Sequence, residues 1–302
     1  MENYQNAKVV LGLMRITEMS DEEVYQLIKG ALDLGIHYFD TADFYGHGKS
    51  EEKIGHVLKA HPELRSQMFI QTKCGLVPSH NGDKYLDLSY EHIKEALYAS
   101  LERMNLDYVD SFLLHRVDIF MDNKEIAKAI SELYKEGKIH HFGISNMDVE
   151  IIKYLQEYLD VPIEVDQLQV SLGQPALLSQ PFNVNFPQQK VNISDGLFFY
   201  LKRKHIALQC WSPYQIGFFE GSIFNEERLP KLNAKLEELA KKYHSTKCGI
   251  ATSFLTMLTP DISIVTGATK LDYIKETLEG AKLVMSKEDW YDLYSATENM
   301  LP

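Results

Sequence analysis

The segment Phe39-Asp40-Thr41-Ala42-Asp43-Phe44-Tyr45-Gly46 places an acid at the end of an apolar, strand-like run and a tyrosine five residues later. This pairing of Asp40 and Tyr45 is unusual for stability alone. It is useful if the tyrosine phenol must give up a proton near neutral pH, because the pKa of a free tyrosine is about 10. Lowering that pKa requires nearby charges, so charged residues from elsewhere in the chain are expected beside Tyr45.

Polar residues also end most of the other apolar runs of the chain. Lys73 and His115 end the third and fourth runs, as Asp40 ends the second. Some polar residues at strand ends only cap the following helix, but their combination here indicates a site. The other members of this set are Ser145, Asn146, Gln167 to Gln169, Trp211 and Ser212.

The elements that must position these residues are eight short β-type runs that alternate with amphipathic segments. Such alternation indicates parallel strands with crossover helices, and eight units over about 270 residues fit a closed (β/α)₈ TIM barrel. We expect one α/β barrel domain over residues 1–302, with additional C-terminal helices. An open doubly wound sheet is the competing arrangement, but no Gly-x-Gly-x-x-Gly follows any strand. The expected strands are Val9–Leu13, Ile36–Asp40, Phe69–Lys73, Val109–His115, His141–Ser145, Val165–Val170, Ala207–Ser212 and Ser263–Thr266.

Helix signals accompany the amphipathic segments. Ser20 and Glu23 form a capping-box pattern before the first helix, and Gly35 ends that helix after Leu34. The other expected helices are Ser50–Leu58, Ser89–Met104, Lys124–Lys135, Asp148–Leu159, Ser194–Lys204, Asn233–Leu258, Leu271–Ala281 and Ser286–Glu298.

Composition excludes several broad classes of protein. The 302 residues are 45% hydrophobic with a net charge of −12, which argues against a general nucleic-acid or membrane-surface binder. The chain has no run of about 18 apolar residues, so no membrane-spanning helix is predicted. Three widely separated cysteines and an N-terminus without signal-peptide features indicate a cytoplasmic protein with reduced thiols.

Asp40, Tyr45, Lys73 and His115, here called the tetrad, resemble the catalytic tetrad of the aldo-keto reductases. The resemblance covers about residues 9–285, and its motifs occur in the family's order. The matching motifs are Phe-Asp-Thr-Ala-Asp-Phe-Tyr-Gly at 39–46, Thr-Lys-Cys-Gly at 72–75, Leu-Leu-His-Arg at 113–116, Gly-Ile-Ser-Asn at 143–146 and Asp-Gln-Leu-Gln-Val-Ser at 166–171.

Elementary chemistry assigns each member of the tetrad a function in carbonyl reduction, which needs a hydride at carbon and a proton at oxygen. Tyr45 is the expected proton donor. Lys73, as an ammonium, would favour the phenolate and lower its pKa, and Asp40 would keep Lys73 charged and oriented. His115 would donate a hydrogen bond to the carbonyl oxygen without itself having to titrate.

The resemblance implies a nicotinamide cofactor, usually NADPH, bound without a Rossmann fold. Ser145, Asn146 and Gln167 match the positions that hold its carboxamide, and side-chain amides are chemically suited to that group. Trp211 matches the aromatic residue that stacks on the nicotinamide ring. The remaining positions that match cofactor contacts are Met14, Ser212, Pro213, Tyr214, Gly217, Gly267, Ala268, Thr269, Lys270, Tyr273 and Glu276.

The sequence departs from the family pattern at the adenosine end of this expected site. Family members commonly carry an arginine three residues beyond the position of Lys270, and here that residue is Tyr273. A tyrosine can stack on adenine but cannot neutralise a phosphate. The resemblance makes NADPH the expected cofactor, and this departure at Tyr273 leaves NADH as the alternative.

Two motifs suggest other sites that their context does not support. Gly46-His47-Gly48-Lys49-Ser50 resembles the end of a phosphate-binding loop, but Asp43 stands where that loop needs glycine. We interpret Ser50 as a helix cap and Asp43 as a hydrogen-bonding loop residue. His140 and His141 point to opposite faces of a strand, so no metal site is expected.

The long segment 172–194, which lacks helical periodicity, and the aromatic run 218–224 are candidate walls of a substrate pocket, as are Arg116, Asp118 and Phe120. Aromatic walls would favour apolar aldehydes or ketones. A packing function is an equal alternative for the long loop.

The sequence thus predicts a carbonyl reductase that uses NADPH and acts on a small aldehyde or ketone. Two alternatives remain at this stage. One is a cofactor-sensing barrel with little turnover, and the other is a Schiff-base aldolase that uses Lys73.

Overall fold

Eight parallel strands form the centre of the fold in a computed structural model, which describes residues 7–79, 82–179, 196–217 and 220–297. Their hydrogen-bonded order, β1-β10-β9-β8-β7-β6-β3-β2, closes into a barrel, which confirms the predicted (β/α)₈ fold. All eight expected strands are present. They are β1 (Val9–Gly12), β2 (Tyr38–Asp40), β3 (Phe69–Cys74), β6 (Val109–Leu114), β7 (Ile139–Ser145), β8 (Ile163–Gln169), β9 (Ala207–Trp211) and β10 (Ile262–Thr266).

The chain forms two compact units. The N-terminal unit comprises Val10–Gln167 and Gly267–Leu271, and the C-terminal unit comprises Met1–Val9, Leu168–Thr266 and Asp272–Pro302. The expectation of a single domain over residues 1–302 stays a prediction.

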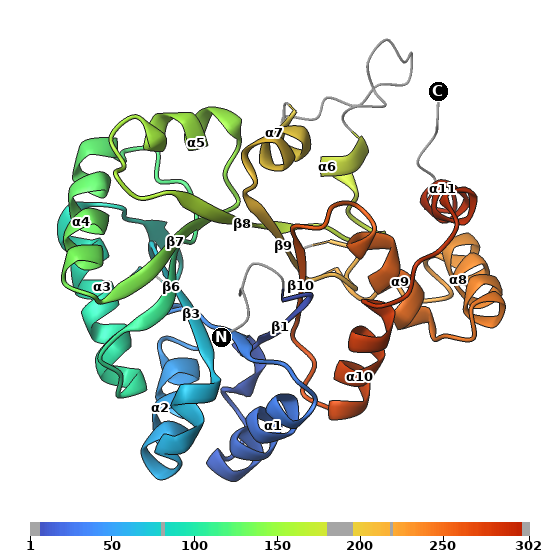
Figure 1. The fold of residues 1–302 in the computed structure, drawn as a ribbon, viewed down its shortest axis with the longest axis horizontal. Coiled ribbons are helices and arrows are strands. Elements are labelled where there is room, and N and C mark those ends of the chain that lie inside the picture. Colours follow the sequence, from blue (N-terminus) through green and yellow to red (C-terminus); the bar gives the residue numbers. More distant parts are fainter. Residues whose placement is uncertain (1–6, 80–81, 180–195, 218–219, 298–302) are drawn as a thin grey trace. The chain divides into compact units, whose positions relative to one another are not determined.

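In the N-terminal unit, helices lie on the outer side of the strands that they connect (Figure 1). The first helix begins with the expected capping box, in which Ser20 and Glu23 exchange hydrogen bonds. Parallel register places Asp40 of β2 beside Gln71 of β3, and Lys73 beside Leu113 of β6. The helices are α1 (Asp21–Asp33), α2 (Lys49–Ala60), α3 (Tyr90–Met104), α4 (Asn123–Lys135) and α5 (Val149–Gln156), with 3₁₀ turns at Met14–Ile16 and Pro62–Gln67.

In the C-terminal unit, α8 and α11 lie side by side (Figure 1). Trp290 of α11 stacks on Phe254 of α9 with ring centroids 4.5 Å apart, and its indole N–H donates to the Phe254 carbonyl over 2.8 Å. The helices are α6 (Ala176–Ser179), α7 (Leu197–Lys204), α8 (Pro230–Lys242), α9 (Lys247–Thr256), α10 (Leu271–Gly280) and α11 (Lys287–Ser295).

The single helix expected over Asn233–Leu258 is wrong, because α8 and α9 are separate helices. His244 adopts a left-handed conformation with φ of 51°, which ends the first helix. Thr246 then accepts a hydrogen bond from the backbone N–H of Gly249 and so begins the second. A Ser-Thr pair inside a long amphipathic pattern therefore marks a new cap.

The expected cap at Ser50 is also wrong. The residue before α2 is Gly48, whose φ is 91°. The Ser50 hydroxyl instead donates to the carbonyl of Leu13 over 2.9 Å and pairs with the Thr41 hydroxyl, also over 2.9 Å. Ser50 thus ties the loop after β2 to the end of β1.

Two further elements do not appear among the expectations. An antiparallel hairpin, β4 (Leu76–Pro78) with β5 (Lys84–Leu86), follows β3. One helical turn, α6, lies inside the segment 172–194, which was expected to lack helix. Residues 180–194 of that segment and residues 218–219 of the aromatic run lie outside the described residues. In the described part of the chain, no helix has the length and apolar character needed to cross a bilayer.

Candidate active site

Lys73 is the centre of a hydrogen-bonded group inside the N-terminal unit. Its side chain is completely buried near the end of β3. The ammonium donates to Asp40 Oδ2 over 2.8 Å, to the Thr41 carbonyl over 2.7 Å and to the Tyr45 hydroxyl over 3.3 Å. The loop after β2 therefore places the Tyr45 phenol beside Lys73, whose position is already fixed by its ion pair with Asp40.

The Asp40 carboxylate accepts hydrogen bonds from three side chains, which lie on two strands, β3 and β8. Besides Lys73, its Oδ1 atom accepts from the amide of Gln71 over 2.6 Å and from the amide of Gln167 over 3.0 Å. Gln71 in turn accepts from the hydroxyl of Tyr38 over 2.6 Å. Burying a carboxylate is costly unless such donors replace the water that it loses.

Gln71 is a site residue that the sequence analysis missed. It lies two residues before Lys73 on β3, so the two side chains share one face of the strand. A polar residue at that spacing in a strand that is otherwise buried was the available signal.

His115 lies edge-on to the phenol, with ring centroids 5.8 Å apart and an interplanar angle of 81°. Burial lowers the pKa of His115 well below its ordinary value, and the charges of Lys73, Arg116 and Lys84 lower it further. The imidazole is thus neutral at physiological pH and offers one N–H. Among the described residues, its buried Nδ1 atom has no hydrogen-bond partner.

The pKa of Tyr45 is raised, whereas the sequence analysis expected it to be lowered. Burial raises it above the ordinary value of 10, and the Lys73 ammonium only partly opposes that effect. Burial also lowers the pKa of Lys73, but Asp40 and Tyr45 outweigh burial and raise it overall. Both protons therefore stay in place at neutral pH, which suits a phenol that donates its proton next to a permanent cation.

The end of β7 and the first residue after it, Ser145 and Asn146, are two of the expected cofactor residues, and Asn146 contacts His115. Asn146 has a left-handed φ of 59°, and its amide donates to the His115 carbonyl over 3.2 Å and to the Ser145 hydroxyl over 2.7 Å. The Ser145 hydroxyl donates to the Gln167 carbonyl over 2.7 Å. The structure thus brings Ser145, Asn146 and Gln167 together with Asp40, as one connected polar group.

The other expected cofactor residues of the N-terminal unit flank β1 and β10. Met14 is partly exposed in the 3₁₀ turn after β1. The neighbouring Arg15 guanidinium donates to the Gly267 carbonyl over 3.5 Å. The segment Gly267, Ala268, Thr269 and Lys270 follows β10 and precedes α10.

The remaining expected cofactor residues belong to the C-terminal unit. The Tyr214 hydroxyl pairs with the Thr252 hydroxyl over 2.7 Å and with the Thr277 hydroxyl over 2.9 Å. Tyr273 is 54% exposed on α10. The others are Trp211 at the end of β9, Ser212 with φ of 48°, Pro213, Gly217, and Glu276, which accepts from the Thr246 hydroxyl over 2.9 Å.

A buried acidic pair lies behind the loop that carries Tyr45. Glu51 is fully buried and accepts from the Thr72 hydroxyl over 2.5 Å and from Arg103 over 2.7 Å. The carboxyl of Asp43 accepts from the backbone of Phe44, but its buried Oδ1 atom has no hydrogen-bond partner among the described residues. Asp43 is therefore only in part the loop hydrogen-bonding residue that the sequence indicated.

The buried Asp43 carboxyl is expected to make the free energy of unfolding fall as the pH rises. Burial, together with the nearby Glu51, raises the pKa of Asp43 from 3.8 to about 7. The unfolded chain releases this proton at lower pH than the folded protein does, so the free energy of unfolding falls between about pH 4 and pH 7. Asp43→Asn should stabilise the protein at pH 8 by an amount on the order of 2 kcal/mol, and much less at pH 5, in urea denaturation.

The matched control for this pH dependence is Glu164→Gln. Glu164 of β8 lies 2.9 Å from His141, and burial raises its pKa to about 7 as well. Each variant should remove part of the pH dependence of the free energy of unfolding. An Asp43→Asn variant whose stability differs from the unmodified protein by the same amount at both pH values would contradict the assignment.

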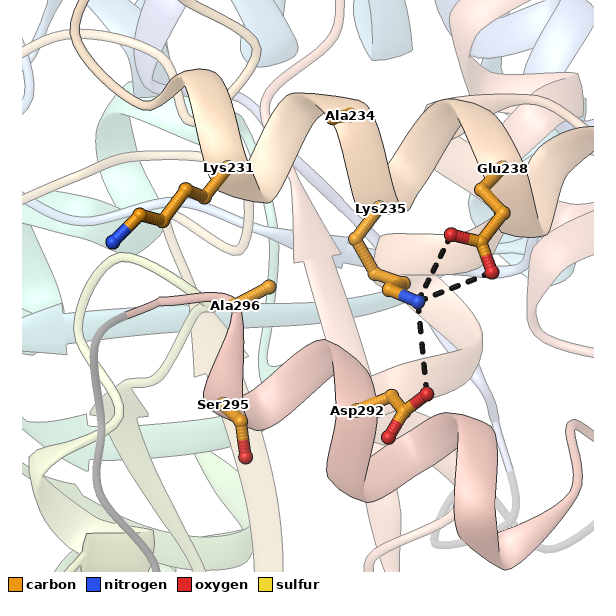
Figure 2. A pocket seen from close by; sticks show the side chains of 7 residues that line it. All are labelled: Lys231, Ala234, Lys235, Glu238, Asp292, Ser295 and Ala296. Atoms are coloured by element: carbon orange, nitrogen blue, oxygen red, sulfur yellow. Dashed lines mark hydrogen bonds and ion pairs between the residues drawn. The ribbon is translucent and has the colours of Figure 1, made fainter.

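A separate hollow in the C-terminal unit has a volume of about 560 Å³ and lies between α8 and α11. Figure 2 shows Lys235 there, with its ammonium 2.9 Å from Glu238 and 3.6 Å from Asp292. None of the expected site residues lines this hollow, and its surface ion pairs contribute little to stability. Its lining residues are Lys231, Ala234, Lys235, Glu238, Asp292, Ser295 and Ala296.

Comparisons with known proteins match the chain to one family over most of its length. The model of the Aldo/keto reductase family matches residues 8–298. A 6-dehydroglucose reductase of Agrobacterium fabrum is 29% identical over 297 residues, with 96% of this chain and 93% of that protein covered. An NADH-specific methylglyoxal reductase of Escherichia coli is 27% identical over 285 residues, with 84% and 81% covered.

Solved structures show the same similarity. A thermostable aldo-keto reductase crystallised with the inhibitor epalrestat is 25% identical to this chain. The superposition covers 95% of this chain and 94% of that one, with a TM-score of 0.75.

Proposed function

This chain belongs to the aldo/keto reductase family of oxidoreductases, and from that premise we propose that it reduces an aldehyde or ketone to an alcohol with NADPH as cofactor. The observation that carries the proposal is the position of the Lys73 ammonium, 2.8 Å from Asp40 and 3.3 Å from the Tyr45 hydroxyl. A phenol with a fixed cation beside it can release its proton to a developing alkoxide, because the cation stabilises the phenolate that remains.

Each member of the tetrad acts at a stated atom in this proposal. Tyr45 Oη holds the proton that passes to the carbonyl oxygen. The neutral His115 donates a hydrogen bond to the same oxygen and so orients the carbonyl. Asp40 acts through Lys73, whose charge it maintains. The cofactor, when bound, supplies the hydride.

The polar group after β7 and on β8 fits a carboxamide. Asn146 and Gln167 provide side-chain amides, and Ser145 provides a hydroxyl, all within one hydrogen-bonded group that reaches Asp40. A carboxamide needs both donors and an acceptor, which amide side chains supply. We assign the nicotinamide carboxamide to these three residues.

The charge state of Lys73 argues against the Schiff-base alternative. An amine nucleophile must be deprotonated, which enzymes achieve by lowering its pKa. Here Asp40 and Tyr45 raise the pKa of Lys73 despite its burial. The other alternative, a cofactor-sensing barrel with little turnover, differs from a reductase only in the rate at which it oxidises the cofactor.

The assay that tests the proposal follows the absorbance of reduced cofactor with a panel of aldehydes. We expect turnover with NADPH and a preference for it over NADH. Tyr273→Arg should increase that preference about 5- to 20-fold, measured as the ratio of kcat/KM values, because arginine forms charge-assisted hydrogen bonds to a phosphate.

A control for added charge is Tyr134→Arg, which places an arginine at a 45% exposed position of α4. It should leave the NADPH-to-NADH ratio unchanged. An equal increase in both variants would mean that Tyr273 does not lie near the phosphate. Failure of the unmodified protein to oxidise either cofactor would overturn the proposed activity.

A further inference from the structure

The loop that carries Tyr45 lies along β3 where it leaves β2. The backbone N–H of Thr41 donates to the Gln71 carbonyl over 2.9 Å, and the backbone N–H of Asp43 donates to the Lys73 carbonyl over 3.1 Å. These bonds continue the pairing of β2 with β3 beyond the last residue of β2. They fix the first residues of the loop, but Tyr45 comes two residues later, so its position depends on how the other end of the loop is held.

The other end of the loop is held by Glu51, a fully buried residue in the first turn of α2. Its Oε1 atom returns to β3 and accepts from the Thr72 hydroxyl over 2.5 Å. Thr72 directly precedes Lys73, and successive strand residues point to opposite faces, so Glu51 binds the face of β3 opposite the lysine. The backbone N–H of Ser50, next to Glu51, donates to the Tyr45 carbonyl over 3.3 Å. The loop is therefore attached to β3 on both sides of Tyr45.

Arg103, in the last turn of α3, fixes the Glu51 side chain in this position. Its Nε and Nη2 atoms donate to Glu51 Oε2 over 2.8 Å and 2.7 Å, so both carboxylate oxygens of Glu51 have partners. The arginine stem also packs against Gly48, where a Cβ atom would lie 2.8 Å from Arg103 Cδ. The last part of the loop thus rests on a side chain of α3.

We propose that Glu51 is a positioning residue for the proton donor, and that it sets the distance between the Tyr45 hydroxyl and the Lys73 ammonium. This inference rests on the proposed reductase function. The two groups lie 3.3 Å apart, at the long limit of a hydrogen bond, so a small shift of the loop would separate them. A buried ion pair adds little net stability over apolar residues of similar size, so the Glu51–Arg103 pair is better explained by the geometry that it fixes.

The first test compares two buried carboxylates that are bound to the same strand. Asp110 of β6 pairs with Arg65 over 3.0 Å and accepts from the backbone N–H of Ile70, near the start of β3, over 2.8 Å. Glu51→Ala should lower kcat about 10- to 100-fold, the effect of a small misplacement of a catalytic group, and leave KM for NADPH nearly unchanged. Asp110→Ala should destabilise the protein to urea to a similar extent but keep kcat within about twofold.

The second test isolates the hydrogen bond to the strand and does not depend on the Glu51→Ala variant folding. Thr72→Val removes the hydroxyl that donates to Glu51, whereas Thr72→Ser retains it. Thr72→Val should lower kcat about 5- to 20-fold, and Thr72→Ser should keep it close to that of the unmodified protein. A crystal structure of Thr72→Val should show the Tyr45 hydroxyl displaced out of hydrogen-bonding distance of Lys73.

Equal losses of kcat in Glu51→Ala and Asp110→Ala would indicate a general effect of lower stability and would overturn the positioning assignment. Full kcat in Thr72→Val, or a loss confined to KM for the cofactor, would also contradict it while leaving the reductase function intact. Absence of turnover by the unmodified protein with every aldehyde would instead count against the reductase function itself. The crystal structure of Thr72→Val would then still test whether this contact sets the position of Tyr45.

Discussion

Replacing Tyr45 by phenylalanine is expected to lower kcat by about 10²- to 10⁴-fold, the usual contribution of a positioned general acid. The substitution removes only the hydroxyl that lies 3.3 Å from Lys73. Binding of reduced cofactor, followed by the change in its fluorescence, should be retained. The loss should therefore appear in kcat at saturating cofactor.

Tyr90→Phe is the matched control for the loss of a phenolic hydroxyl. Tyr90 begins α3 in the same unit, and its hydroxyl hydrogen-bonds Glu132. This variant should keep kcat within about twofold of the unmodified protein. If Tyr45→Phe behaves in the same way, the proton comes from another group.

Lys73→Met is expected to abolish turnover and to lower the free energy of unfolding by about 3–5 kcal/mol. Lys73 and Asp40 are both buried, so removing the lysine leaves a carboxylate without its counter-ion. The two glutamine amides that also reach Asp40 would remain and compensate for part of the loss. Urea denaturation at pH 7 measures the difference.

The control for this prediction is Lys53→Met, which breaks a solvent-exposed ion pair of 2.7 Å with Asp21. An exposed pair contributes about 0–1 kcal/mol, so this variant should be close to the unmodified protein in stability. The double variant Asp40→Asn/Lys73→Met should be more stable than the sum of the single changes implies. Strict additivity would show that the two groups do not interact.

The strands and most helices could be predicted from the sequence because their signals are local. Apolar runs, the Ser20 capping box and the strand-end polar residues all lie within a few positions of the feature they indicate. The wrong predictions concern helix starts, where a capping residue lies within or just before a longer helical pattern. Thr246 interrupts a run that was expected to be one helix, and Gly48 takes the cap that Ser50 was expected to provide.

The sequence predicted mainly the site residues at strand ends, because the ends of parallel strands meet at one edge of a barrel. The spacing of Gln71 from Lys73 was a local signal, but its contact with Asp40 depends on which side chains of separate elements meet. The Glu51–Arg103 pair depends on the same kind of contact, and no local pattern encodes that pair. The direction of the Tyr45 pKa was missed for a related reason. The attraction of Lys73 can be foreseen from residue type, but the opposing effect of burial depends on the packed structure.

The hydrogen bonds of Asp40 also bear on how the chain selects its strand register. Gln71 and Lys73 reach Asp40 from one face of β3, while Thr72 points to the opposite face and binds Glu51. A slip of β3 by one residue would exchange these faces and leave the carboxylate and the ammonium buried without each other. The same ion pair that prepares the proton donor therefore penalises mispaired barrels, so substitutions at Asp40 or Lys73 should slow or misdirect folding as well as chemistry.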